Sequence, residues 1–179
     1  FAAIDGLLAL MKSAQITAHE VAKIDIATYG PAVSVTDRPD PQTPQECKFS
    51  MQYVIAHAAY FGSVRIDAFE EMRMKDQEIR ALMPKISLTL DQQIDDQFPV
   101  RRAARVSVTS KAGGVFIHDQ HTRKGDPDLP LSDEELSEKF VELTSPVLGS
   151  HSTDKLLKNL WMLEQIDLSA CLTQAMSSK

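Results

Sequence analysis

Hydrophobic and polar residues recur along this chain with two periods, one typical of helices and one typical of strands. The segment 41–62 carries the most complete helical signal. Thr43 and Glu46 have the spacing of a capping box, Pro44 suits a first helical position, and Gly62 suits a left-handed stop. The pattern predicts one helix whose apolar stripe faces a core. That stripe comprises Cys47, Met51, Val54, Ala58 and Phe61.

A second face of the same predicted helix carries polar and aromatic side chains. Glu46, Ser50, Tyr53 and His57 also recur at steps of three and four, so they form one row. The Tyr53 hydroxyl in such a row can point into a cleft. Two other roles stay open, because a helix tyrosine often packs with its hydroxyl satisfied and a lone histidine is often structural.

Strand signals occupy the middle of the chain. Four segments alternate apolar and polar residues as half-buried strands do: 23–29, 85–91, 104–110 and 115–121. Helical periodicity covers 1–14, parts of 67–83 and two segments after Ser132, where Glu135 completes another capping box. The proline-rich segment 30–42 predicts a loop. The fold class is therefore α+β, with helices packed on a small, mainly antiparallel sheet. We expect a lid-like domain over 1–122 and a helical segment over 123–179.

Composition narrows the classes of protein that fit. The 179 residues are 43% hydrophobic and 25% charged, which is ordinary for a globular chain. The net charge of −6 disfavours a nucleic-acid partner, and no apolar run reaches the length of a membrane span. With no secretory signal and only Cys47 and Cys171, the chain fits a reducing, cytoplasmic location. Phe1 lies inside a helical pattern, so we expect this sequence to be a piece of a longer protein.

Two segments carry a family resemblance. ECKFSMQYVIAHAAYFGSV (46–64) and KGDPDLPLSDEELSEKF (124–140) resemble the C-terminal half of the MmgE/PrpD family, and the resemblance runs from Ile4 to about Leu163. Known members include 2-methylcitrate dehydratases, cis-aconitate decarboxylases and iminodisuccinate epimerases. These are lyases or isomerases that move a proton at carbon beside carboxylates and need no redox cofactor. The resemblance therefore implies a positioned acid or base, and cations that hold the substrate.

The resemblance implies site residues one by one. Tyr53 matches the tyrosine of the helix motif and is the expected catalytic residue, while Lys48, His57 and Arg38 are expected to bind substrate. Solvated roles remain the alternatives for Lys48 and Arg38. His118, Asp119 and His121 do not make a metal site, because residues three apart on a strand point to opposite faces and no third histidine or cysteine has zinc-like spacing. We expect no metal and no cofactor.

The same resemblance implies partners and an activity. We expect a small di- or tricarboxylate substrate, a missing N-terminal helical domain and a homodimer, without nucleic acid or membrane. The activity expected is most like that of a 2-methylcitrate dehydratase, an enzyme of propionate catabolism, and the fragment alone is expected to be inactive. The alternative is a non-catalytic small-molecule binding or dimerisation domain derived from such an enzyme.

Overall fold

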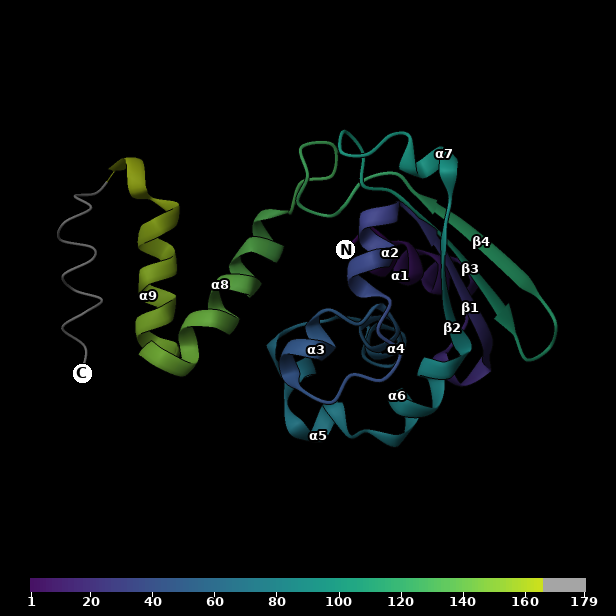
Figure 1. Ribbon diagram of the computed structural model, residues 1–179. Helices are drawn as coiled ribbons and strands as arrows, with labels where there is room; N and C mark the ends of the chain where they lie inside the picture. The colour runs from purple at the N-terminus through teal and green to yellow at the C-terminus, as the bar shows by residue number, and fades with distance from the viewer. Residues whose placement is uncertain (166–179) are drawn as a thin grey trace. The chain divides into compact units, whose positions relative to one another are not determined.

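The computed structural model describes residues 1–165, and Cys171 lies outside them (Figure 1). The chain divides between Leu129 and Pro130 into two compact units. The helices are α1 (Ala2–Ala14), α2 (Gly30–Thr36), α3 (Pro44–Lys48), α4 (Met51–Phe61), α5 (Glu71–Met74), α6 (Gln77–Leu82), α7 (Gln92–Asp95), α8 (Asp133–Leu148) and α9 (Ser150–Trp161). The strands are β1 (Val21–Thr28), β2 (Ile86–Leu90), β3 (Ala104–Ser110) and β4 (Val115–Gln120).

The four expected strands form one sheet in the order β2-β1-β3-β4. Strand β1 pairs with β3 and β3 pairs with β4 in antiparallel fashion, while β1 and β2 run parallel. The α+β fold class is therefore confirmed. The sheet is mixed because the chain crosses through α2 to α6 between β1 and β2, and such a crossover brings the second strand back in the same direction.

The core of the first unit lies between the sheet and helices α1 and α4. Helix α1 contacts β3 and β4, and α4 contacts β2, so both cover one face of the sheet, as Figure 1 shows. Leu7, Ile24 and Ile55 contribute fully buried side chains from three different elements. Gly6 allows α1 to approach closely, because a Cβ there would lie 3.1 Å from Gln120 Cβ. The helix expected over residues 1–14 is confirmed.

The segment predicted as one helix from Thr43 to Gly62 is two helices, α3 and α4. The predicted capping box is confirmed, since Glu46 N–H donates to Thr43 Oγ1 at 3.2 Å. The predicted stop is confirmed too, because α4 ends at Gly62 with φ 70°. The break lies at Phe49 and Ser50, where the Ser50 side chain accepts from Tyr53 N–H and caps α4. A serine that caps the next turn competes with helical continuity, which the apolar spacing does not reveal.

Part of the proline-rich segment is also helical, contrary to the predicted loop over 30–42. Helix α2 begins at Gly30, and Pro31 lies within its first turn, where the missing N–H is not needed. Gly30 and Pro31 therefore begin a helix and not a loop. Only the stretch after Thr36 is irregular, and it carries Asp37, Arg38 and Asp40.

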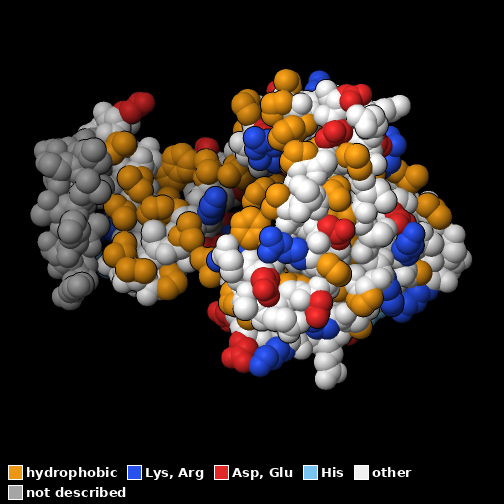
Figure 2. Space-filling view, viewed as in Figure 1, with side chains coloured by type: hydrophobic (Ala, Val, Ile, Leu, Met, Phe, Trp, Pro, Cys, Tyr) orange, Lys and Arg blue, Asp and Glu red, His pale blue; other side chains and the backbone are white. Residues whose placement is uncertain are grey.

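The second unit consists, in its described part, of α8, α9 and a short turn to Gln165. The predicted capping box is confirmed, because Glu135 N–H donates to Ser132 Oγ at 3.2 Å. Hydrophobic side chains lie on the visible surface of this helical pair in Figure 2. The exposed ones are Leu136, Leu143, Val147, Trp161, Met162 and Leu163. Among the described residues of the chain, no helix has both the length and the apolar character to cross a bilayer.

Candidate functional site

The polar row of α4 is buried. Every residue from Met51 to Ala58 is buried, so the row faces other parts of the first unit instead of an open cleft. The Tyr53 side chain has no exposed surface, and its hydroxyl donates a hydrogen bond to the Ala68 carbonyl. Burial raises the pKa of Tyr53 to about 12, so the phenol stays protonated at neutral pH. The catalytic role expected for Tyr53 stays a prediction.

His57 lies one helical turn after Tyr53, and the two ring centroids are 6.2 Å apart. Its side chain is 1% exposed, and Nδ1 lies 2.8 Å from the Ser63 carbonyl oxygen. Its Nε2 has no hydrogen-bond partner among the described residues. Burial lowers the pKa of His57, so the neutral ring is favoured. The ring is out of reach of solvent, and its expected contact with substrate stays a prediction.

Arg38 is held through its backbone by residues at the start of α4. Ser50 Oγ donates to the Arg38 carbonyl at 2.6 Å, and the Gln52 side chain accepts from Arg38 N–H at 3.3 Å. Gln52 also donates to the Asp37 carboxylate at 2.6 Å. The exposed Arg38 guanidinium lies 6.0 Å from the Phe49 ring centroid. The loop is thus fixed while its cation remains on the surface.

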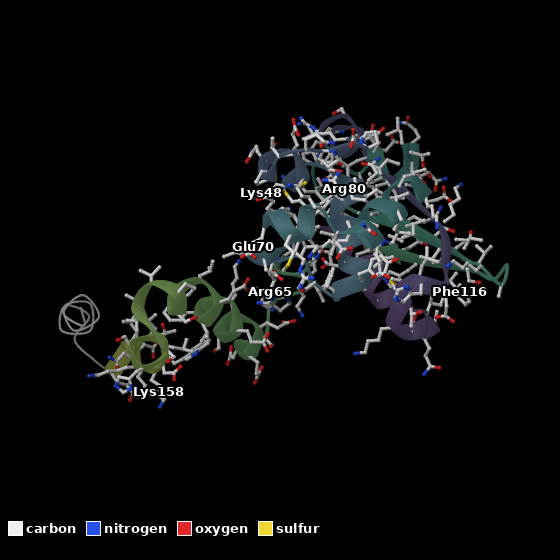
Figure 3. The ribbon with its side chains drawn as sticks, turned by 90° about the horizontal axis from the view of Figure 1, so that it is seen from below. Lys48, Arg65, Glu70, Arg80, Phe116 and Lys158 are labelled. Carbon is white, nitrogen blue, oxygen red and sulfur yellow. The ribbon has the colours of Figure 1, made fainter. Side chains whose placement is uncertain are left out.

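Lys48 ends helix α3 and is exposed. Its ammonium group lies 5.5 Å from the centroid of the Phe69 ring, a cation–π distance. The same Phe69 ring lies 6.3 Å from that of Tyr53. In Figure 3, Lys48, Glu70 and Arg65 lie along one side of the first unit, and Phe116 marks the sheet hairpin away from them. The structure therefore gathers Lys48 and the Tyr53–His57 pair around the segment that follows α4.

Two residues of this region have no simple sequence signal. Arg80 on α6 donates from Nη1 to the Pro41 carbonyl at 2.8 Å and from Nε to the Met74 carbonyl at 2.6 Å. Its guanidinium lies 5.9 Å from the Tyr53 ring centroid. Gln52 is the second such residue. It lies within a run of buried α4 residues, and this position is the one feature that indicates a buried polar partner for its side chain.

His118 and Asp119 of β4 have local partners within the sheet. His118 Nε2 lies 3.0 Å from Gln120 Oε1, and Asp119 forms an ion pair with Arg105 at 2.6 Å. Within residues 1–165, no group of three histidine, cysteine or acidic side chains is arranged to hold a metal ion.

Comparison with known protein families identifies the class to which this fold and these motifs belong. Residues 1–163 match the model of the MmgE/PrpD C-terminal domain. The match covers most of the 179 residues, so the chain belongs to the MmgE/PrpD family. The resemblance seen in the two sequence motifs is confirmed.

Two relatives are similar over most of this chain. It is 29% identical over 143 residues to a cis-aconitate decarboxylase of Homo sapiens, covering 80% of this chain and 30% of the relative. It is 27% identical over 144 residues to a cis-aconitate decarboxylase of Mus musculus, covering 80% of this chain and 29% of the relative. The matched part of the chain thus spans less than a third of the length of these curated relatives.

Proposed function

We propose that this chain is the C-terminal domain of an enzyme that acts on a small tricarboxylate by acid–base chemistry at carbon, in the cytoplasm and without a cofactor. The observation that carries the proposal is the family match over residues 1–163, with cis-aconitate decarboxylases among the relatives. The geometry supports it, because the exposed Lys48 ammonium lies 5.5 Å from the Phe69 ring centroid, and that ring lies 6.3 Å from the ring of the buried Tyr53.

The cations account for substrate binding in this proposal. A tricarboxylate needs several positive partners, and each charge-assisted contact is stronger than a neutral hydrogen bond. Lys48 and Arg38 are exposed, and the Arg38 carbonyl accepts a hydrogen bond from Ser50 Oγ at the start of α4. We propose that both bind substrate carboxylates, and that the remaining groups come from the rest of the protein.

Tyr53 is proposed to supply a proton or a hydrogen bond. A phenol with a pKa of about 12 is a poor base at neutral pH but keeps its hydrogen for donation. For direct catalysis the hydroxyl has to exchange the Ala68 carbonyl for the substrate. If it never does so, Tyr53 acts only by fixing the segment that contains Ala68.

Decarboxylation of cis-aconitate is the first reaction to test, because both relatives named above carry that activity in their names. Dehydration of 2-methylcitrate is the second, since the sequence motifs are shared with that branch of the family. Release of carbon dioxide distinguishes the first reaction from the second, which releases water. A protein that performs neither reaction and still binds a tricarboxylate would support the non-catalytic binding domain instead.

The experiment uses the longest natural polypeptide that contains this sequence. Both substrates are supplied to the parent protein and to Tyr53→Phe, Lys48→Met and Lys12→Met variants. Loss of a charged contact in Lys48→Met should raise KM by roughly tenfold to a hundredfold. Lys12 is an exposed lysine of α1 and serves as the matched control.

The Tyr53→Phe variant separates the two roles of the hydroxyl. Loss of a general acid should lower kcat by about a hundredfold or more, whereas a role in holding the segment should cost about tenfold at most. Full activity in Tyr53→Phe contradicts any role of this hydroxyl in turnover. Equal effects of Lys48→Met and Lys12→Met contradict the proposed carboxylate contact.

The partners follow from the same proposal. We propose that the apolar side chains of α8 and α9 pack on the helical domain that the rest of the enzyme supplies, and that the enzyme is a homodimer. The exposed Val147 on α8 and Trp161 on α9 support this, since exposed apolar patches mark interaction sites. Light scattering of the intact protein tests the dimer.

A further inference from the structure

We propose that His57 is a positioning residue, whose neutral ring fixes the conformation of the segment 62–69 through one hydrogen bond from Nδ1 to the Ser63 carbonyl. The loop conformation itself is a property of this chain. Its importance for turnover rests on the function proposed above.

The segment is held at two points by one helix. It leaves α4 at Gly62 and returns to the interior at Ala68, which is buried. The Ser63 carbonyl meets His57, and the Ala68 carbonyl accepts from Tyr53, one helical turn away on α4. Of the residues between these points, Val64 is half-buried against the core and 65–67 are exposed. Two buried side chains therefore set the geometry of a surface loop.

The hydrogen bond to Ser63 fixes the form of the His57 ring. A carbonyl oxygen only accepts, so Nδ1 carries the hydrogen and Nε2 is left with a lone pair in the neutral ring. Nε2 is buried and has no partner among the described residues. A second proton would create a cation in a place that solvent does not reach, so the neutral Nδ1–H tautomer holds the segment.

Aromatic packing leaves the ring little freedom to turn. The Phe61 ring lies 4.8 Å from the His57 ring between centroids, and the Arg73 guanidinium lies 4.0 Å from the Phe61 ring centroid. The ring of Tyr53 lies on its other neighbouring turn, at 6.2 Å. A rotation of the imidazole would displace Phe61 and with it the Arg73 contact.

The charged groups around His57 predict how pH acts on the segment. Burial lowers the pKa of His57 most, and Arg73 adds to this, while the Ser63 hydrogen bond, Asp67 and Asp76 raise it. The net shift is downward, so the folded ring stays neutral below the ordinary value of about 6.5. Protonation at Nε2 leaves the Nδ1–H donor in place, so the free energy that changes is that of burying the ring. The closed segment is fully favoured above about pH 6.5, and this preference falls as the pH drops from there through the lower pKa of the folded state, because the opened, solvated ring takes up a proton more readily than the buried one.

Substitution of His57 by asparagine or glutamine distinguishes the roles of the two ring nitrogens. The asparagine Nδ2 occupies nearly the place of Nδ1, so His57→Asn keeps a donor for Ser63. The glutamine Nε2 lies nearer the place of the unpartnered ring nitrogen, so His57→Gln loses that donor while keeping an amide. His57→Leu removes both. His121→Asn, at an exposed histidine, is the matched control.

The experiment measures amide hydrogen exchange of residues 62–69 in the full protein and in these variants, together with kcat and KM for cis-aconitate. Exchange of these amides should rise roughly tenfold in His57→Gln and His57→Leu and stay near the parent value in His57→Asn. In the parent, protection should fall as the pH drops below about 6.5, and in His57→Asn it should not. kcat/KM should fall with protection and recover in His57→Asn.

The outcomes separate this proposal from the proposed function. Equal exchange in His57→Asn and His57→Gln, or unchanged exchange in His57→Leu, overturns the role of the Nδ1 hydrogen bond. Faster exchange with unchanged kcat/KM overturns its importance for turnover. If the parent protein turns over neither tricarboxylate, the proposed function has failed, and the exchange data still decide whether His57 fixes the segment.

Discussion

The two units of this chain bury their side chains in different ways. The first unit closes a core between a four-stranded sheet and the helices α1 and α4, with Ile24, Ile26 and Val106 fully buried. In the second unit, Thr153 is the one buried side chain among residues 130–165. Trp161 is 51% exposed, and its Nε1 donates to Ser137 Oγ at 3.1 Å.

Both units nevertheless begin a helix with the same local signal. Thr43 with Glu46 and Ser132 with Glu135 form capping boxes of identical spacing. Local signals therefore specify where helices start in both units, while long-range contacts specify a core only in the first. Most helix stability comes from packing of an apolar face, so α8 and α9 depend on what covers them more than α1 and α4 do. Substitutions matched between the units can test this difference.

The largest effect is expected from deleting core volume in the first unit. Ile24→Ala removes a fully buried side chain from the central strand β1 and should lower the free energy of unfolding by about 2–5 kcal/mol. The matched change, Val147→Ala, alters a side chain that is 81% exposed and should cost less than about 0.5 kcal/mol.

Urea denaturation with two probes measures both variants. Trp161 is the single tryptophan of the chain and reports on the second unit, whereas circular dichroism of the sheet reports on the first. An equal loss of stability in the two variants would mean that α8 is packed as tightly as β1 in solution.

An added methyl group should disturb the two units for different reasons. In Gly6→Ala the new Cβ lies 3.1 Å from Gln120 Cβ and 3.2 Å from Val106 Cγ2, so α1 must move from the sheet. We expect a cost of about 1–3 kcal/mol from overpacking, less the ~1 kcal/mol that alanine gains in a helix. In Gly149→Ala the space is open, but the backbone is at φ 74° and ψ 157°, which costs about 1–3 kcal/mol without glycine.

The two probes again separate the glycine variants. Gly6→Ala should move the transition of the first unit and leave the Trp161 signal in place, and Gly149→Ala should do the reverse. A joint shift in either variant would show that the two units unfold as one.

The elements that could be predicted from the sequence are those set by neighbouring residues. The capping boxes, the Gly62 stop and the four alternating strands have local causes, and all are present. The parallel pairing of β1 with β2 has no local cause, since it depends on how the chain between them folds. The start of α2 at Gly30 was not predicted, because a proline such as Pro31 is common both in loops and in the first turn of a helix.

The candidate site shows the same limit. Spacing placed Tyr53 and His57 on one face of a helix, and they do lie side by side. The spacing could not show that this face is buried, because its partners, the carbonyls of Ser63 and Ala68, belong to a segment that folds back over α4. Arg80 was missed because its acceptors are backbone carbonyls. Every residue has a backbone carbonyl, so the sequence does not indicate which ones accept from Arg80.

The smallest effect, and the most direct test of the comparison, comes from the two matched caps. Thr43→Ala removes the acceptor for Glu46 N–H, and Ser132→Ala removes the acceptor for Glu135 N–H. Each cap is worth about 0.5–2 kcal/mol to its own helix. In Thr43→Ala that amount should appear in the unfolding of the whole first unit, because α3 leads into α4, which packs in the core.

In Ser132→Ala the same loss should appear as fraying of α8 alone, seen as less helical circular dichroism at an unchanged midpoint for the first unit. Thr43→Ser and Ser132→Thr keep a hydroxyl at each cap and should restore most of the parent behaviour. Should Ser132→Ala lower the midpoint of the first unit as far as Thr43→Ala does, the helices of the second unit are coupled to that core. The second unit would then not unfold independently of the first.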